Sequence, residues 1–216
     1  MPQEAIQNTI KHLKDRRSYN ANAIAENRYR YEQDLLVGHK TQAKNPKTGQ
    51  LKDYTVKIID FNNVANNIYH VVDELWVKST LTSERRRPDL ICFVNGLPLV
   101  QIELKRRGVA IKEAFNQINR YQRDSFWGGS GLYEYAQIFI ISNGTHTKYY
   151  SNTTRFKHIH GMEGRPATGR SQKSSDSFEF TSWWADGRNH VIADLTGFAR
   201  TFLARHTLLN ILTRYC

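Results

Sequence analysis

One stretch of the chain, residues 87–105, constrains the fold more than any other. It reads R-P-D-L-I-C-F-V-N-G-L-P-L-V-Q-I-E-L-K, in which the apolar runs Leu90–Val94 and Leu99–Leu104 flank Asn95-Gly96. The Asn-Gly dipeptide tolerates the positive φ angles of tight turns, and between two apolar runs it is the strongest short-range signal for a β-hairpin. The sequence therefore predicts a hairpin that turns at Asn95-Gly96.

This hairpin is expected to bring ionisable side chains together. Apolar and polar residues alternate along 100–105, so Glu103 and Lys105 share one face of the strand. If the turn is centred on Gly96, Asp89 lies opposite Glu103 and Arg87 lies opposite Lys105, with opposed Cβ atoms ~4.5–5.5 Å apart. A slip of one residue would break this arrangement, and a β-bulge could restore it.

Two carboxylates this close repel each other unless a cation lies between them. Carboxylate oxygens suit Mg²⁺ or Mn²⁺ better than zinc, and such an ion can polarise a water molecule into a nucleophile. Lys105 could orient that water or neutralise charge on a phosphate. The ordinary alternative is an edge hairpin in which Glu103 and Lys105 form a surface pair and Asp89 is a turn residue. A short motif of this kind supports a metal site only as a hypothesis.

Three segments give the motif a wider context. They are 87–105, T-V-K-I-I-D-F-N-N-V-A-N-N-I-Y-H-V-V-D-E-L-W-V at 55–77, and I-F-I-I-S-N-G-T at 138–145. The first resembles the PD-(D/E)xK nuclease superfamily. Together they resemble, more narrowly, the N-terminal nuclease domain of the restriction (R) subunit of type I restriction-modification enzymes. The resemblance covers roughly residues 50–215.

This resemblance implies an α/β fold, in which a central mixed sheet flanked by helices forms a restriction-endonuclease-like core. It implies hydrolysis of DNA phosphodiesters with Mg²⁺ or Mn²⁺, with Asp89 and Glu103 as metal ligands beside the catalytic Lys105. The carbonyl of Leu104 is a further candidate ligand. Because the sequence contains no recognisable base-reading module, we expect cleavage without intrinsic sequence specificity.

The apolar spacing from residue 111 onward predicts a helix, on which Gln117 and Tyr121 lie four residues apart. On spacing alone such a pair is a local surface contact. A Q-x-x-x-Y helix after the E-x-K strand is similar to exonuclease-type members of the superfamily, which implies that Gln117 and Tyr121 position DNA. An upstream helix often supplies another acidic group in these proteins, and Glu26 and Glu32 are the candidates.

The chain has a formal net charge of +11, which favours a polyanionic partner. RNA or a membrane surface would satisfy the charge as well as double-stranded DNA. Basic clusters at 85–87 and 105–107 bracket the two carboxylates, an arrangement typical of a phosphate-backbone track. We therefore expect Arg87, Arg106 and Arg107 to contact DNA.

We expect one nuclease domain over residues 1–216, with a helical and loop part at 1–50, a catalytic core at 51–150, and a loop plus helices at 151–216. The expected elements are helices within 4–37, a polar loop at 41–53, strands at 54–61 and 68–78, a helix from 111, a second hairpin at 136–150, a mobile loop at 153–177, an extended segment at 178–184 and one or two helices at 195–215.

Several other functions find no support in the sequence. No apolar run is long enough to span a membrane, and no signal peptide follows Met1. The two cysteines, Cys92 and Cys216, have no disulfide or zinc-site spacing, which suits a reducing cytoplasm. Residues 164–171 imitate a phosphate-binding loop but lack the strand and helix that such a loop requires. His158 and His160 have no third ligand nearby, so no zinc site is expected there.

The end of the sequence, at residues 214–216, carries no helix-stop signal. The resemblance implies that ATP-driven motor domains follow, so we expect a longer parent chain, with ATP used only by domains absent from this one. It also implies modification and specificity subunits as partners. Two alternatives stay open: a repair-type resolvase or exonuclease with the same core, and a non-catalytic DNA-binding or assembly domain.

Overall fold

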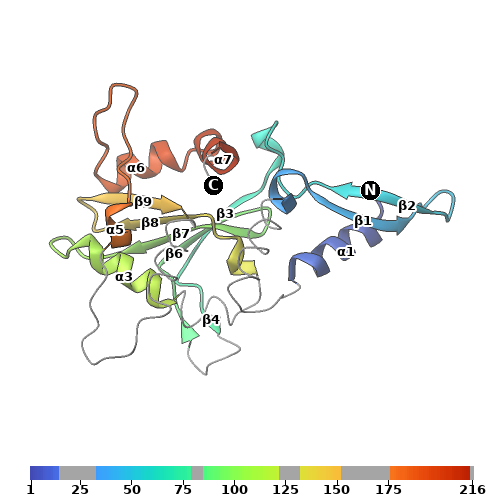
Figure 1. The fold of residues 1–216 in the computed structure, drawn as a ribbon, viewed down its shortest axis with the longest axis horizontal. Coiled ribbons are helices and arrows are strands. Elements are labelled where there is room, and N and C mark those ends of the chain that lie inside the picture. Colours follow the sequence, from blue (N-terminus) through green and yellow to red (C-terminus); the bar gives the residue numbers. More distant parts are fainter. Residues whose placement is uncertain (15–32, 79–84, 122–131, 152–175, 215–216) are drawn as a thin grey trace.

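The structure, a computed structural model, describes residues 1–14, 33–78, 85–121, 132–151 and 176–214. At its centre lies a five-stranded sheet with the order β3-β6-β7-β8-β9 (Figure 1). β7 and β8 are parallel, and the other neighbours are antiparallel, so the predicted mixed sheet is confirmed. The strands are β3 (Tyr69–Asp73), β6 (Leu90–Val94), β7 (Leu97–Leu104), β8 (Ile138–Ser142) and β9 (Thr147–Ser151).

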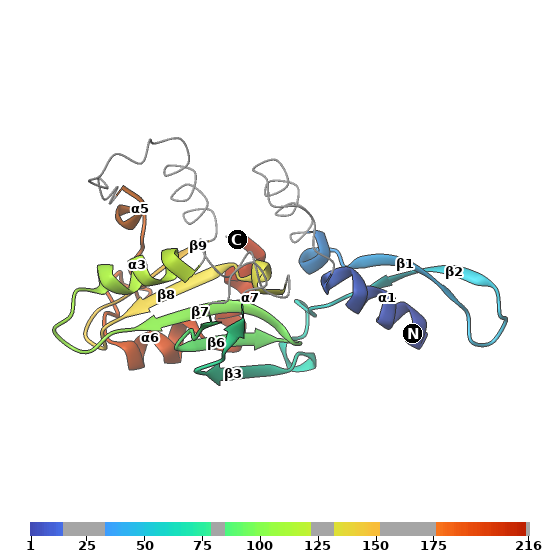
Figure 2. The same ribbon diagram turned by 90° about the horizontal axis from the view of Figure 1, so that it is seen from below.

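Helices cover both faces of this sheet, which makes the fold α/β as predicted (Figure 2). α3 (Ile111–Tyr121) connects the parallel strands β7 and β8 and packs Phe115 and Ile118 against Phe139 on one face. α6 (Leu195–Phe202) and α7 (Arg205–Arg214) bury their apolar stripes against the other face. Every residue of β8 is buried, as a strand covered on both faces requires. This layered arrangement is compatible with a PD-(D/E)xK-like core.

The N-terminal elements form a smaller unit beside one end of the sheet (Figures 1 and 2). α1 (Gln3–Lys14) packs its buried face on an antiparallel pair, β1 (His39–Lys44) and β2 (Leu51–Val56). The prediction of a polar loop over 41–53 is therefore right only for the connecting turn at 45–50 and wrong for its two ends, which are strands. Six paired positions stabilise two strands whose side chains are mostly exposed, so the apolar alternation that identifies a strand in sequence is missing.

Other predicted boundaries need correction. The strand expected at 54–61 ends with β2 at Val56, and the single strand expected at 68–78 is two strands, β3 and β4 (Val77–Lys78), in different sheets. A positive φ of 48° at Glu74 separates them. β4 pairs with β5 (Arg85–Arg86). The segment expected to be extended from 178 begins instead in α5 (Asp176–Glu179).

The helix from 111, the second hairpin and the helix pair at 195–215 are confirmed. Two short 3₁₀ helices complete the described part, η1 (Val64–Asn66) and η3 (Leu132–Tyr135). Most of the helix expected within 21–37 and of the loop expected at 153–177 lies outside the described residues. Within the described residues, none of the helices combines the length and hydropathy that a membrane span needs.

Candidate metal centre

The site begins with the predicted hairpin, which the structure confirms. Asn95 and Gly96 have φ angles of 49° and 83°, both positive, as a type I′ turn requires. The side chain of Asn95 fixes the turn to its surroundings: Oδ1 accepts the Ile68 N–H at 2.7 Å, and Nδ2 donates to the Ile58 carbonyl at 2.8 Å. The turn is therefore anchored to the segment that precedes β3.

A β-bulge sets the register beyond the turn. Leu99 is an extra residue in β7, and the ladder past it ends at the pair Leu90–Ile102. One step further, Asp89 faces Glu103, as predicted. Counting from the turn without the bulge would put Asp89 opposite Ile102, whose side chain packs into the core on the other face of the sheet. The bulge thus restores the alignment of the two carboxylates.

Glu103 occupies an unusual environment for a carboxylate. Its side chain has 0% of its surface exposed, and neither oxygen has a hydrogen-bond partner among the described residues. Burial and the Asp89 carboxylate raise the pKa of Glu103 to about 8, against the opposing effect of Lys105. A buried carboxyl group with a second carboxylate beside it fits a hard divalent cation.

Asp89 is held by the strand that carries Glu103. Its Oδ2 accepts a hydrogen bond from the Leu104 N–H at 2.7 Å, and its own carbonyl accepts the Glu74 N–H at 3.0 Å. The carboxylate is therefore oriented toward β7 by a backbone donor, and its side chain is only half-buried. A rigid, partly exposed carboxylate next to a fully buried one leaves one side open to a ligand.

Lys105 lies on the same face as Glu103, as the strand alternation predicted. Its Nζ is 3.6 Å from Glu103 Oε1 and donates a hydrogen bond to Oε1 of Gln117 on α3. With 20% of the side chain exposed, the ammonium group is shielded but reachable from solvent. The structure thus brings Gln117, twelve residues further along the chain, into contact with Lys105.

The arginines expected at this site have different surroundings. Arg87 lies beyond the last pair of the ladder, where its guanidinium forms an ion pair with Glu74 at 3.1 Å and lies 5.3 Å from the Trp76 ring. Arg106 and Arg107 are exposed directly after β7. They add two positive charges directly after the strand that carries Glu103.

One polar residue of this face was not singled out from the sequence. Gln101 lies two residues before Glu103 in β7, is 1% exposed, and has neither amide atom hydrogen-bonded among the described residues. The sequence did contain a signal for it: Gln101, Glu103 and Lys105 occupy alternate positions, so their side chains lie on the same face of the strand. The side chain of Tyr121, at the end of α3, lies outside the described part, as do Glu26 and Glu32.

Comparison with known proteins identifies the family of this chain. Residues 3–158 match the family model described as the N terminus of the type I restriction enzyme R protein. The EcoprrI type I restriction enzyme endonuclease subunit of Escherichia coli is 42% identical over 160 residues, which are 74% of this chain and 45% of that protein.

More distant relatives carry the same description. The SauCOLORF180P type I endonuclease subunit of Staphylococcus aureus (strain COL) is 34% identical over 74% of this chain and 14% of its own length. A putative MjaIXP type I endonuclease subunit of Methanocaldococcus jannaschii is 35% identical over 60% of this chain and 12% of its own. This chain thus spans less than half of each of these relatives. Because the family model covers most of it, the chain belongs to the family of type I restriction enzyme R proteins and corresponds to their N-terminal part.

Proposed function

We propose that this chain is the nuclease part of a type I restriction enzyme and hydrolyses phosphodiester bonds of double-stranded DNA with Mg²⁺ or Mn²⁺. The single observation that carries the proposal is the buried Glu103 carboxyl group, which faces Asp89 and lies 3.6 Å from the Lys105 ammonium. Without a bound metal ion, burial and the Asp89 charge both favour the protonated form of Glu103, whereas a divalent cation would favour the ionised pair.

The residues present fit a divalent ion. Asp89, Glu103 and the carbonyl of Leu104 would hold it, and these are the hard oxygen donors that Mg²⁺ and Mn²⁺ prefer. When bound, the ion supplies electrostatic stabilisation of the negative charge that develops on the phosphate. The pKa of about 8 for Glu103 means that cation binding must also displace a proton from this group near neutral pH.

Lys105 would act on the attacking water. Its ammonium is held on one side by Gln117 and faces Glu103 on the other, so its position does not depend on bound DNA. From there it would orient the water, help to remove its proton, and offset charge on the phosphate. Gln117 acts as a positioning residue for this lysine. We assign Tyr121, Arg87, Arg106 and Arg107 to contacts with the DNA backbone.

Sequence specificity would come from elsewhere in the assembly. The sequence contains no recognisable base-reading module, which is the basis for this part of the proposal. Target recognition would belong to the specificity subunit, methylation to the modification subunit, and ATP use to motor domains outside this chain. The cytoplasm, where such an assembly meets DNA, is the location that follows from this proposal.

The test uses the complete restriction enzyme assembled with the variant R protein. Asp89→Asn, Glu103→Gln and Lys105→Ala should each lower ATP-dependent DNA cleavage by at least about 100-fold, the typical effect of removing one group that stabilises transition-state charge. The ATPase rate should be unchanged, because motor function lies elsewhere. Glu113→Gln, the same chemical change at an exposed position on α3, is the matched control.

Cleavage at the wild-type rate in all three variants would show that the carboxylates serve only structure. Loss of the ATPase rate together with cleavage would indicate misfolding of the variant. Cleavage of free DNA ends or junctions by the isolated chain, independent of ATP, would favour a repair-type nuclease instead.

A further inference from the structure

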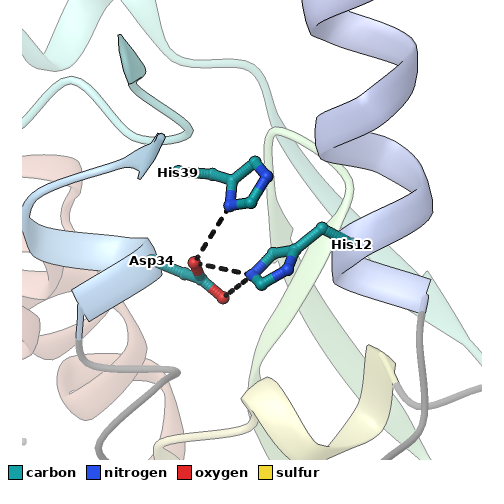
Figure 3. A group of neighbouring side chains, drawn as sticks. All are labelled: His12, Asp34 and His39. Atoms are coloured by element: carbon teal, nitrogen blue, oxygen red, sulfur yellow. Dashed lines mark hydrogen bonds and ion pairs between the residues drawn. The ribbon is translucent and has the colours of Figure 1, made fainter. Parts of the chain in front are cut away.

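A second group of potential metal ligands lies outside the site described above. His12 at the end of α1, Asp34 in the helical turn at 33–36, and His39 at the start of β1 point toward one another (Figure 3). Each offers one ligand atom, and the three atoms lie within 4.8 Å of one another. The residues come from three separate elements, so the group is a product of the tertiary fold.

The contacts within the group are close. Nε2 of His12 is 2.9 Å from Oδ2 and 3.0 Å from Oδ1 of Asp34, and Nδ1 of His39 is 3.9 Å from Oδ1. The two imidazole rings stack with centroids 3.8 Å apart and planes 18° from parallel. Asp34 is 5% exposed, and its Oδ2 also accepts a hydrogen bond from the Tyr135 hydroxyl at 3.1 Å.

These separations match those of ligands around one transition-metal ion. Zinc–nitrogen and zinc–oxygen bonds are ~2.0–2.2 Å, so two ligands of one ion can be at most ~4.2 Å apart. Both histidine-to-aspartate separations fall below this limit. The His12 and His39 rings are stacked, so one ring must turn out of the stack before both nitrogens can point at the same ion. A carboxylate that is hydrogen-bonded by a second residue, as Asp34 is by Tyr135, is the usual support of such a ligand.

The ligand types select the kind of ion. Two imidazole nitrogens and one carboxylate oxygen suit zinc or a similar transition metal, whereas Mg²⁺ prefers oxygen ligands alone. Three protein ligands leave the fourth position of a tetrahedral ion to water. The group therefore differs in chemistry from the Asp89 and Glu103 pair.

It also differs in place. Tyr135 precedes β8, whose first residue, Ile138, pairs with Val100, whereas Glu103 pairs with Ile141 further along the same strands. Three residues of strand correspond to ~10 Å. The histidine group thus lies toward the start of β7, where the N-terminal unit meets the sheet (Figure 2), and the carboxylate pair lies at its end.

We propose that His12, Asp34 and His39 bind a zinc-class transition-metal ion that fastens the N-terminal unit of α1, β1 and β2 to the nuclease core. The ion would connect α1 to β1 directly. Asp34 accepts a hydrogen bond from the Tyr135 hydroxyl, so the ion would also connect α1 and β1 to the segment that leads into β8. Binding of the ion stabilises the folded chain, because the three ligands are brought together only by folding.

The test titrates Zn²⁺ into the purified chain after chelator treatment and measures the binding isotherm by calorimetry. Wild type should bind one Zn²⁺ that the double variant Asp89→Ala/Glu103→Ala retains. His12→Gln and His39→Gln should each weaken this binding by more than about 100-fold, since even a supporting partner of a ligand is typically worth 10–100-fold.

Two further measurements separate loss of a ligand from loss of the fold. Tyr135→Phe, which leaves all three ligands in place, should weaken Zn²⁺ binding by about 10- to 100-fold. Added Zn²⁺ should raise the Tm of wild type but not that of His12→Gln. The double variant His158→Gln/His160→Gln controls for the other paired histidines and should bind like wild type.

The proposal is overturned if wild type binds no Zn²⁺, or if the bound ion is lost with Asp89 and Glu103. Loss of Zn²⁺ binding in the double variant His158→Gln/His160→Gln would overturn it as well. The proposal is also overturned if His12→Gln and His39→Gln bind Zn²⁺ with the wild-type isotherm. If either variant is unfolded by circular dichroism, the Tyr135→Phe isotherm decides the question alone.

Discussion

Glu103 is a glutamate whose side chain is fully buried and whose pKa is raised by that burial to about 8. Strand alternation and the Asn-Gly turn together predicted that Asp89, Glu103 and Lys105 converge, and the structure brings them together. The complete burial of Glu103 could not be read from the sequence, because it depends on α3 packing over the strand. The His12, Asp34 and His39 group was equally inaccessible, since its members share no short motif.

The raised pKa of Glu103 leads to a prediction for the metal-free chain. The group's pKa rises from 4.5 to about 8 on folding, so the folded state holds a proton that the unfolded state has lost between these values. The free energy of unfolding should therefore fall as pH increases from about 4.5 to 8, by an amount on the order of a few kcal/mol. Glu103→Gln should remove this part of the pH dependence.

Urea denaturation at a series of pH values in EDTA measures this effect, with Glu113→Gln as the exposed control. Added Mg²⁺ at pH 8 should stabilise wild type and leave Glu103→Gln unchanged, because cation binding favours the ionised carboxylate. Parallel pH curves for wild type and Glu103→Gln would contradict this assignment.

At the scale of elements, the hairpin of β6 and β7 carries most of the site. Its turn was predictable because only a few residue pairs accept two positive φ angles. The position of the bulge was not, because Leu97–Val100 is apolar and buried at every position, so neither face is marked in the sequence. The pair β1 and β2 was missed for the opposite reason: its few apolar residues, Ala43 in β1 and Leu51, Tyr54 and Val56 in β2, do not alternate regularly with polar ones over the length of either strand.

Two substitutions at Asn95 separate the roles of its backbone and its side chain. Asn95→Gly keeps the positive φ but loses the hydrogen bonds to the Ile58 and Ile68 backbone, which should cost about 1–3 kcal/mol of unfolding free energy. Asn95→Ala should cost about 1 kcal/mol more, because alanine is also strained at φ 49°. Chemical denaturation of both variants checks this order, and equal stability of the two would show that the backbone angle carries no cost.

At the scale of the whole molecule, the sequence predicted the sheet, the covering helices and the excess of positive charge. It did not predict that α3 covers one face of the sheet while α6 and α7 cover the other, because each helix shows only that it has an apolar stripe. This packing brings Lys105, the neighbour of Glu103, into contact with Gln117 of α3, and the exposed Arg106 and Arg107 follow Lys105 in the sequence.

The charge distribution predicts how DNA binding depends on salt. If Arg106 and Arg107 each contact one phosphate, Arg106→Gln/Arg107→Gln should reduce the slope of log K against log salt concentration by about 2. Lys47→Gln/Lys52→Gln removes the same charge from the distant β1–β2 hairpin and should leave the slope unchanged (Figure 1). Fluorescence anisotropy with duplex DNA in EDTA measures both; equal slopes for the two double variants would place the DNA elsewhere.

The central claim is that Asp89 and Glu103 hold one divalent ion. Its most direct test is the anomalous difference density of crystals of this chain soaked in Mn²⁺. The account predicts a peak within ligand distance of both carboxylates, and its loss in Glu103→Gln. Density that contacts neither carboxylate, or side chains of Asp89 and Glu103 that point apart, would contradict it.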